Sequence, residues 1–215
     1  MKKHSIEYKK VLFYCGILMF LSESWKQYCL TYLVNKGIYD WWYFPFQLCS
    51  IPMYVCLLFP FISSKGSCSL MLTFLMDFGL LGGIFTFFDT TGMYYSYLPL
   101  TIHSFAWHIL LILMGIYAGC TGKADYSKKG YAKAVCGFLV CCLFATLFNL
   151  FFYPYGRINM FYISPYYQMG QLVFRDIARI LGNGIGIASY ILAILTGAGL
   201  LHLIWNYCSR LRCSQ

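Results

Sequence analysis

The sequence predicts an all-α integral membrane protein, a bundle of six transmembrane helices with the N- and C-termini in the cytoplasm. The first observation is composition: 60% of the 215 residues are hydrophobic and 11% are charged, whereas soluble domains carry about 25% charged residues. A soluble fold of this size would have to bury more apolar surface than one core can hold. The second observation is that the apolar residues form long runs with basic residues between them.

Six apolar runs are long enough to cross the hydrocarbon core, which takes roughly 20 residues. We expect them to form a single membrane domain over residues 1–215. The predicted spans are approximately residues 11–32, 44–62, 69–88, 98–119, 132–152 and 184–207.

Each span is bounded by a recognisable signal. The first run follows a lysine-rich start, but no small-residue cleavage site comes after it, so we predict a span and not a signal peptide. Short polar segments separate the next runs, at residues 35–37, 63–66, 89–92 and 121–130. The fifth connection, residues 153–183, is the longest and the least apolar, and it has room for a short interfacial helix.

The basic residues predict the orientation. With the N-terminus inside, eleven Lys and Arg residues fall on the cytoplasmic side and four on the other, with Lys26 inside a span. The cytoplasmic set is Lys2, Lys3, Lys9, Lys10, Lys65, Lys123, Lys128, Lys129, Lys133, Arg210 and Arg212, and the opposite set is Lys36, Arg157, Arg175 and Arg179. This bias follows the positive-inside rule. We therefore predict a multi-pass protein of the cell membrane.

Composition also excludes several functional classes. The net charge of +9 does not indicate nucleic-acid binding, because the basic residues lie in short loops and tails beside apolar spans. Such flanks suit anionic lipid headgroups at the cytoplasmic face. The eleven cysteines are scattered through apolar runs, where cysteine behaves as a small buried hydrophobe. The sequence has no metal-ligand spacing, phosphate-binding loop or dinucleotide fingerprint, so we predict no cofactor and no metal. Membrane lipids are the expected partners, and the oligomeric state stays open.

Polar residues inside the predicted spans mark a candidate site in the outer half of the membrane. Ionisable groups are costly there and by default indicate function or a polar interior. Gln47 and Cys49 lie in the first turns of the second span, and His103 and His108 lie about five and ten residues into the fourth. At about 1.5 Å of rise per residue, Cys49 and His103 reach similar depths.

Other interpretations of these residues remain open. A histidine in a span can simply be packed against a neighbouring carbonyl group. Glu23 and Lys26 are three residues apart on one helix face, and they suit a structural ion pair better than an acid–base device. Asp77, near the middle of the third span, fits either a buried structural acid or a proton site.

The segments that hold these residues resemble the YwaF-like integral membrane proteins. The resemblance covers nearly the whole chain, through the Glu23 and Lys26 pair and the segments 44–51, 103–108 and 157–165. That family includes bacterial proteins and is related to a eukaryotic transmembrane cysteine acyltransferase of ether phospholipids. The resemblance implies that Cys49 is a nucleophile and that a histidine of the fourth span is its base. Many members carry histidine where this chain has Gln47.

We therefore predict a lipid acyltransferase or lipid hydrolase. A histidine can generate the reactive thiolate, and Arg157 or Asn159 would orient a headgroup or stabilise an oxyanion. A small-solute transporter, a substrate-binding membrane subunit and a non-catalytic scaffold are the alternatives.

Overall fold

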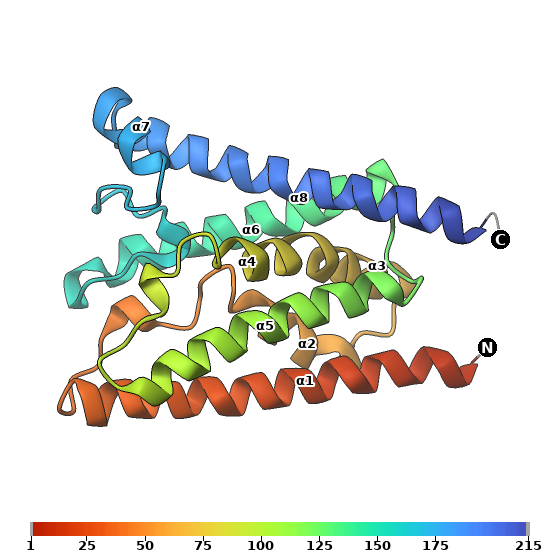
Figure 1. The fold of residues 1–215 in the computed structure, drawn as a ribbon, viewed down its shortest axis with the longest axis horizontal. Coiled ribbons are helices and arrows are strands. Elements are labelled where there is room, and N and C mark those ends of the chain that lie inside the picture. The colour runs from red at the N-terminus through yellow and green to blue at the C-terminus, as the bar shows by residue number, and fades with distance from the viewer. Residues whose placement is uncertain (1, 214–215) are drawn as a thin grey trace.

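The computed structural model describes the backbone of residues 2–213 and the side chains of residues 7–211, and this part of the chain is all-helical. The α-helices are α1 (Lys2–Tyr28), α2 (Ile51–Leu58), α3 (Lys65–Phe74), α4 (Leu80–Phe85), α5 (Leu98–Cys120), α6 (Lys128–Phe152), α7 (Phe174–Leu181) and α8 (Asn183–Cys213). Short π- and 3-10 helices extend or connect them: η1 (Cys29–Val34), η2 (Trp41–Tyr43), η3 (Phe59–Phe61), η4 (Leu75–Gly79), η5 (Thr91–Met93), η6 (Tyr153–Tyr155) and η7 (Met160–Tyr162). The long helices lie side by side, and both chain ends lie at the same end of the molecule (Figure 1).

Four helical segments are long and apolar enough to cross a membrane: Lys65–Phe85, Leu98–Cys120, Lys128–Tyr155 and Asn183–Leu211. They correspond to the last four predicted spans, so the chain is a multi-pass integral membrane protein. The first predicted span runs through α1 into η1 and is not among these four segments. The 27 residues of α1 suffice for a crossing, but Glu23, Lys26 and Gln27 make its second half polar. The fifth connection contains α7, so a short helix is present where the sequence had room for one.

The second predicted span differs from the sequence expectation. Residues 44–50 form turns, and the apolar helix covers only Ile51–Phe61. Proline explains the late start: Phe44, which precedes Pro45, has an extended backbone with ψ 131°, as steric clash with a following proline ring requires. Pro52 lies in the first turn of α2, where its missing N–H costs no helical hydrogen bond.

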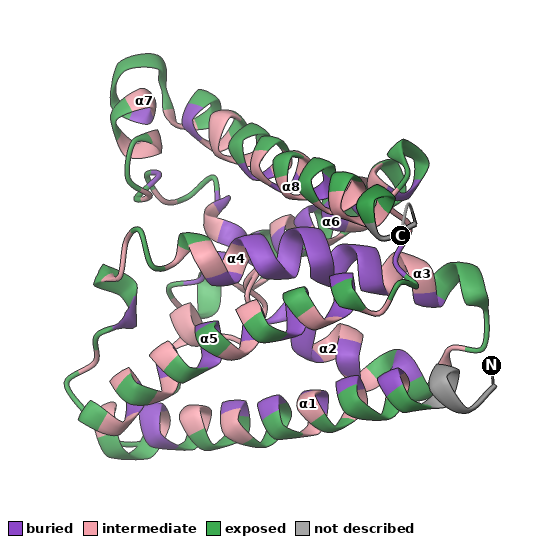
Figure 2. Ribbon diagram, turned by 45° about the vertical axis from the view of Figure 1, so that its right-hand side comes forward, coloured by how far each residue is buried: buried purple, intermediate pink, exposed green. Residues whose placement is uncertain are grey.

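The segment α3–η4–α4 forms the centre of the bundle. Its apolar stretch is 67% buried, against 17% for the stretch in α8, and Figure 2 shows this contrast in burial colours. Glycine permits the close packing of α4 on α5, because a Cβ at Gly115 would lie 2.6 Å from the Cβ of Leu80. Small residues at such contacts are typical of membrane helices.

Two apolar clusters lie on either side of this centre. One joins α1, α2, α3 and α5 around Leu12, Phe59 and Leu111. The other joins the central segment to α6, α8 and the loop 157–163, around Phe78 and Phe138, whose rings stack with centroids 4.8 Å apart. The turns at residues 44–50 run between the two clusters, since Phe46 and Leu48 pack on the second while Cys49 packs on the first.

Candidate functional site

Cys49 lies in the turn that precedes α2, and α5 holds its backbone in place. The indole Nε1 of Trp107 donates a hydrogen bond to the carbonyl oxygen of Cys49 at 3.1 Å. Trp107 is itself buried in the first cluster. Cys49 itself is half-buried. The hydrogen bond from Trp107 fixes its backbone where the turn before α2 meets α5.

Glu23 and Lys26 form the predicted ion pair on α1. The Lys26 Nζ lies 2.8 Å from the Glu23 Oε1, and the Gln27 Nε2 donates to the same oxygen at 2.7 Å. Gln27 also donates to the carbonyl oxygen of Tyr43 at 2.6 Å, which ties the pair to the turn after α1. The second carboxylate oxygen, Oε2, is buried and has no hydrogen-bond partner in the described structure. An unpaired buried oxygen is costly.

His103 faces α1 and lies against the same pair. Its Nε2 lies 3.1 Å from the Ser22 hydroxyl oxygen, and its ring packs between Trp25 and Trp107, with centroids 5.6 and 5.7 Å away. Its Nδ1 is buried and unpartnered among the residues described. Glu23 Oε2 and His103 Nδ1 are thus two unsatisfied polar atoms between α1 and α5.

His108 is buried one turn deeper, and its hydrogen bond defines its tautomer. Its Nδ1 lies 2.7 Å from the carbonyl oxygen of Ser104. A carbonyl oxygen can only accept, so Nδ1 carries the proton. In the neutral ring Nε2 is then the nitrogen with a free lone pair, which is the form that a general base requires.

Cys49 does not hydrogen-bond either histidine in the part of the chain that the structure describes. What connects them is the Glu23–Lys26 pair. Both charged residues interact electrostatically with Cys49 and with His103, and Lys26 also acts on His108. Trp107 also joins Cys49 and His103 by direct contacts: it bonds the Cys49 carbonyl oxygen, and its ring packs on that of His103.

Gln47 and Asn159 support the loop between α6 and α7. The Gln47 Nε2 donates to the carbonyl oxygen of Asn159 at 2.9 Å, and the N–H of Phe161 donates to the Gln47 Oε1 at 2.7 Å. The Asn159 Oδ1 accepts from the N–H of Ser164 at 2.9 Å. Both side chains thus bind backbone groups of a largely buried loop.

Asn149 was not singled out from the sequence, yet it completes this support. It is fully buried in α6, its Nδ2 donates to the carbonyl oxygen of Met160 at 3.0 Å, and its Oδ1 accepts from the N–H of Met160 at 2.6 Å. The loop needs this support because Phe161 and Tyr162 both have φ +57°, a left-handed conformation that non-glycine residues rarely adopt. The sequence signal for this role was a single amide side chain, that of Asn149, within the apolar run 132–152.

His202 was also missed, and it pairs with Asp77. Its Nδ1 lies 2.8 Å from the Asp77 Oδ2 and its Nε2 lies 3.0 Å from the carbonyl oxygen of Ser127. Asp77 is fully buried within the π-helix η4, a helix type that often occurs at functional sites. The pair fixes α8 to the central segment.

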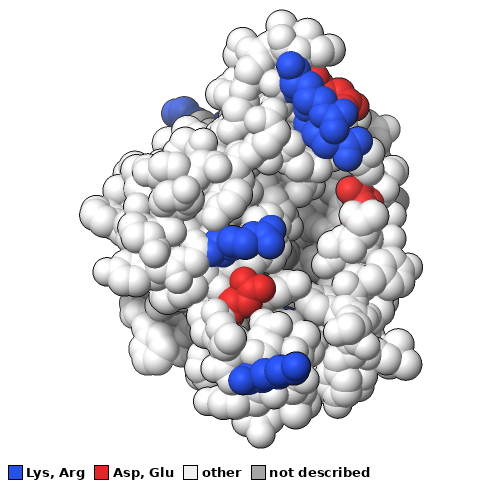
Figure 3. All heavy atoms as spheres, turned by 90° about the vertical axis from the view of Figure 1, so that its left-hand side faces the viewer, with Lys and Arg blue, Asp and Glu red and all other residues white. Residues whose placement is uncertain are grey.

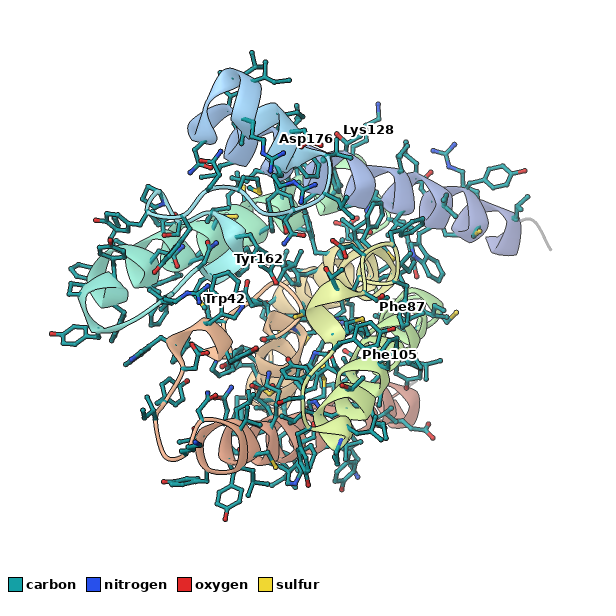
Figure 4. All side chains as sticks on the ribbon, turned by 60° about the vertical axis from the view of Figure 1, so that its left-hand side comes forward. Trp42, Phe87, Phe105, Lys128, Tyr162 and Asp176 are labelled. Carbon is teal, nitrogen blue, oxygen red and sulfur yellow. The ribbon has the colours of Figure 1, made fainter. Side chains whose placement is uncertain are left out.

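The end of the molecule opposite the termini carries charged side chains around a hollow (Figure 3). Arg157 lies with its guanidinium 5.5 Å from the ring of Trp42. Trp42 in turn contacts Tyr162, with centroids 6.3 Å apart, and the two rings come from separate segments (Figure 4). At the same end, hydrogen bonds from the hydroxyl and N–H of Thr91 hold the pKa of Asp89 below its usual range.

Comparison with known proteins gives one informative match. No curated protein and no solved structure shows significant similarity to the chain. The model of the TMEM164 family matches residues 1–205. Because this match covers almost the whole sequence, the chain belongs to the TMEM164 family of integral membrane proteins.

Proposed function

We propose that the chain is a membrane enzyme that acts on lipid esters, as an acyltransferase or a hydrolase, with Cys49 as the nucleophile. The observation that carries this proposal is the link between Cys49 and His103 through Trp107, which donates to the Cys49 carbonyl oxygen at 3.1 Å and packs its ring on that of His103 with centroids 5.7 Å apart. The resemblance to YwaF-like proteins and their cysteine acyltransferase relative supports the same chemistry. Gln47, which replaces the histidine of many such proteins, serves the loop and not the reaction.

The proposed reaction has two steps. A histidine of α5 accepts the thiol proton, and the thiolate attacks the ester carbonyl carbon. The tetrahedral intermediate expels the lipid alkoxide, which takes the proton from the histidine, and a thioester remains on Cys49. A second lipid hydroxyl or a water molecule then attacks the thioester and regenerates the thiol. The Lys26 ammonium is the cation that would stabilise the thiolate.

Either histidine has a feature that suits the base. His108 presents a free lone pair on Nε2, and His103 has an unpartnered Nδ1 beside the ion pair. Neither is within hydrogen-bond distance of the thiol in this structure, and catalytic hydrogen bonds often tighten only when substrate binds.

The proposed topology has six spans with both termini in the cytoplasm of the cell. Two features support it: α1 is long enough to cross, and the bias of eleven basic residues against four favours this orientation. In this arrangement Cys49 and His103 occupy the outer half of the bilayer, where a lipid ester can reach them without leaving the membrane.

The test is covalent labelling of the purified protein with a lipid-like, cysteine-reactive acyl probe. We expect labelling of the wild type, none in Cys49→Ala, and strongly reduced labelling in either His103→Ala or His108→Ala. Cys15→Ala, which removes another half-buried cysteine, is the matched control and should label normally.

Unchanged labelling in Cys49→Ala would refute the cysteine mechanism. Stoichiometric binding of a small solute without covalent labelling would favour a transporter or a substrate-binding subunit. Loss of folding in His103→Ala, with no activity in the wild type, would favour a scaffold.

A further inference from the structure

Helix α7 lies at the end of the molecule opposite the termini and is joined to α8 by one glycine (Figure 1). Gly182 has φ +96°, a conformation that glycine adopts without strain. Its N–H donates to the carbonyl oxygen of Ala178 at 3.0 Å, which closes the last turn of α7. The chain therefore turns sharply between the two helices.

One edge of α7 packs tightly on the first turns of α8. A Cβ at Gly186 would lie 2.5 Å from the Cβ of Ala178, and the ring of Phe174 meets that of Tyr190 edge-on with centroids 5.3 Å apart. Asn183 holds the preceding loop by accepting from the N–H of Met169 at 2.7 Å. These contacts fix the orientation of α7 about its own axis relative to α8.

The rest of α7 is amphipathic and unpacked. Ile180 and Leu181 are 81% and 58% exposed, although both are large and apolar. Arg175 and Arg179 project from the other side of the helix. Asp176, one turn before Ile180 and labelled in Figure 4, lies at the edge between the two faces and pairs with both arginines at 3.5–3.6 Å. A helix with one apolar edge and a charged face with arginines is typical of the membrane interface.

We propose that α7 docks into the phospholipid leaflet at this end of the protein. Ile180 and Leu181 enter the boundary with the acyl chains, and Arg175 and Arg179 bind lipid phosphate groups. Two observations specify lipid as the occupant. The exposed edge continues the surface of a candidate membrane span, which begins at Asn183 and has Ile185 half exposed. Arginine also matches phosphate oxygens in charge and geometry.

The first test places the photoreactive residue p-benzoylphenylalanine at position 180 or, as a control on the other side of the helix, at position 175. The full-length protein is reconstituted in vesicles of phosphatidylcholine with one-fifth phosphatidylglycerol, irradiated and weighed by mass spectrometry. We expect a lipid adduct at position 180 and little at position 175. Equal adducts at both positions, no adduct at 180, or crosslinks from 180 to a second copy of the chain would each overturn the proposal.

The second test removes the arginines. In Arg175→Gln/Arg179→Gln we expect the lipid adduct at position 180 to fall by at least about fivefold, the effect of losing even one of the two basic contacts with an anionic surface. Lys123→Gln, in the polar loop at the other end, should leave the adduct unchanged. An undiminished adduct in a double variant that elutes as the wild type does would show that the arginines do not hold the helix at the phosphates.

Discussion

Lys26 is the residue on which the proposed chemistry most depends. It is the cation that acts on Cys49, His103 and His108 together. Glu23 holds its ammonium group at 2.8 Å, so the charge has a defined position on α1. A charge at a fixed position in a medium of low polarity acts more strongly than one in water.

Replacing Lys26 by methionine should slow alkylation of Cys49. The variant keeps the length of the side chain but removes the cation. We expect the rate to fall about tenfold, which corresponds to about 1.4 kcal/mol of lost thiolate stabilisation. Mass-resolved alkylation with a small haloacetamide measures the rate at Cys49. Lys36→Met, in the loop after α1, is the control, and equal rates in both variants would contradict a role for Lys26.

The Asp77–His202 pair shares one proton between the carboxylate and the imidazole ring by necessity. The carbonyl oxygen of Ser127 only accepts, so the Nε2 of His202 carries a hydrogen. The 2.8 Å contact between Nδ1 and the Asp77 Oδ2 then needs one further proton between them. Asp125 and Tyr131 are the other titratable groups that act on this pair, and the ring of Tyr131 packs against His202.

Removing the acid from this pair should destabilise the fold. Asp77→Ala leaves the buried Nδ1 of His202 without a partner, and breaking a buried pair costs about 3–5 kcal/mol. Asp77→Asn can still donate an N–H to Nδ1, so we expect a smaller loss. Thermal unfolding in detergent should rank the midpoints as wild type, Asp77→Asn, Asp77→Ala. An Asp77→Ala midpoint equal to that of the wild type would show that the pair does not stabilise the protein.

At the scale of elements, the apolar runs predicted the long helices well. The predicted spans 98–119 and 132–152 lie within a residue or a turn of α5 and α6. Residues 44–50 were predicted as helix because they are apolar, but Pro45 and the contacts of Phe46 and Leu48 with the second cluster keep them as turns. Hydropathy measures the solvent that a segment tolerates, and it does not report the backbone conformation.

The partners of the polar side chains could not be predicted from local pattern. Gln47 meets a backbone group 112 residues away, and Asp77 meets a histidine 125 residues away. The sequence did indicate that Glu23 and Lys26 form a pair, because three residues on one helix fix their separation. Contacts between helices depend on packing, which a single sequence does not reveal.

The loop 157–165 should loosen when either supporting amide is removed. Gln47→Ala and Asn149→Ala each delete two hydrogen bonds to its backbone and leave buried polar groups unpaired, at a cost of about 1–3 kcal/mol per group. We expect faster amide hydrogen exchange at Met160 and Phe161 in both variants. Gln168→Ala, an exposed residue of the same connection, should exchange as the wild type does. Unchanged exchange in Gln47→Ala and Asn149→Ala would contradict this support.

At the scale of the whole molecule, the distribution of basic residues and the arrangement of the helices indicate the same orientation in the membrane. Both termini lie at one end and α7 lies at the other (Figure 1), and the lysine-rich loop 121–130 is at the end of the termini. This shared position of the termini agrees with the even number of crossings in the proposed topology.

Glycosylation mapping should report this polarity. An acceptor site inserted after Gly170 should be glycosylated when the protein is made in microsomes, and one inserted after Lys123 should not. The reason is that these loops lie on opposite sides in the proposed topology, and the transferase works only in the lumen. Modification after Lys123 alone would reverse the orientation.

The amides of Gln47 and Asn149 also have a consequence for biogenesis. Both are synthesised before the loop that they bind, so for part of translation the growing chain presents two amides inside the bundle with no backbone to accept or donate to them. Water or a translocon component has to solvate them until residues 157–165 leave the ribosome. Helices α7 and α8 follow this loop in the sequence, so they are synthesised after the loop becomes available to bind the two amides. A chain that ends near residue 155 would therefore keep both amides without the backbone groups that they bind in the complete protein.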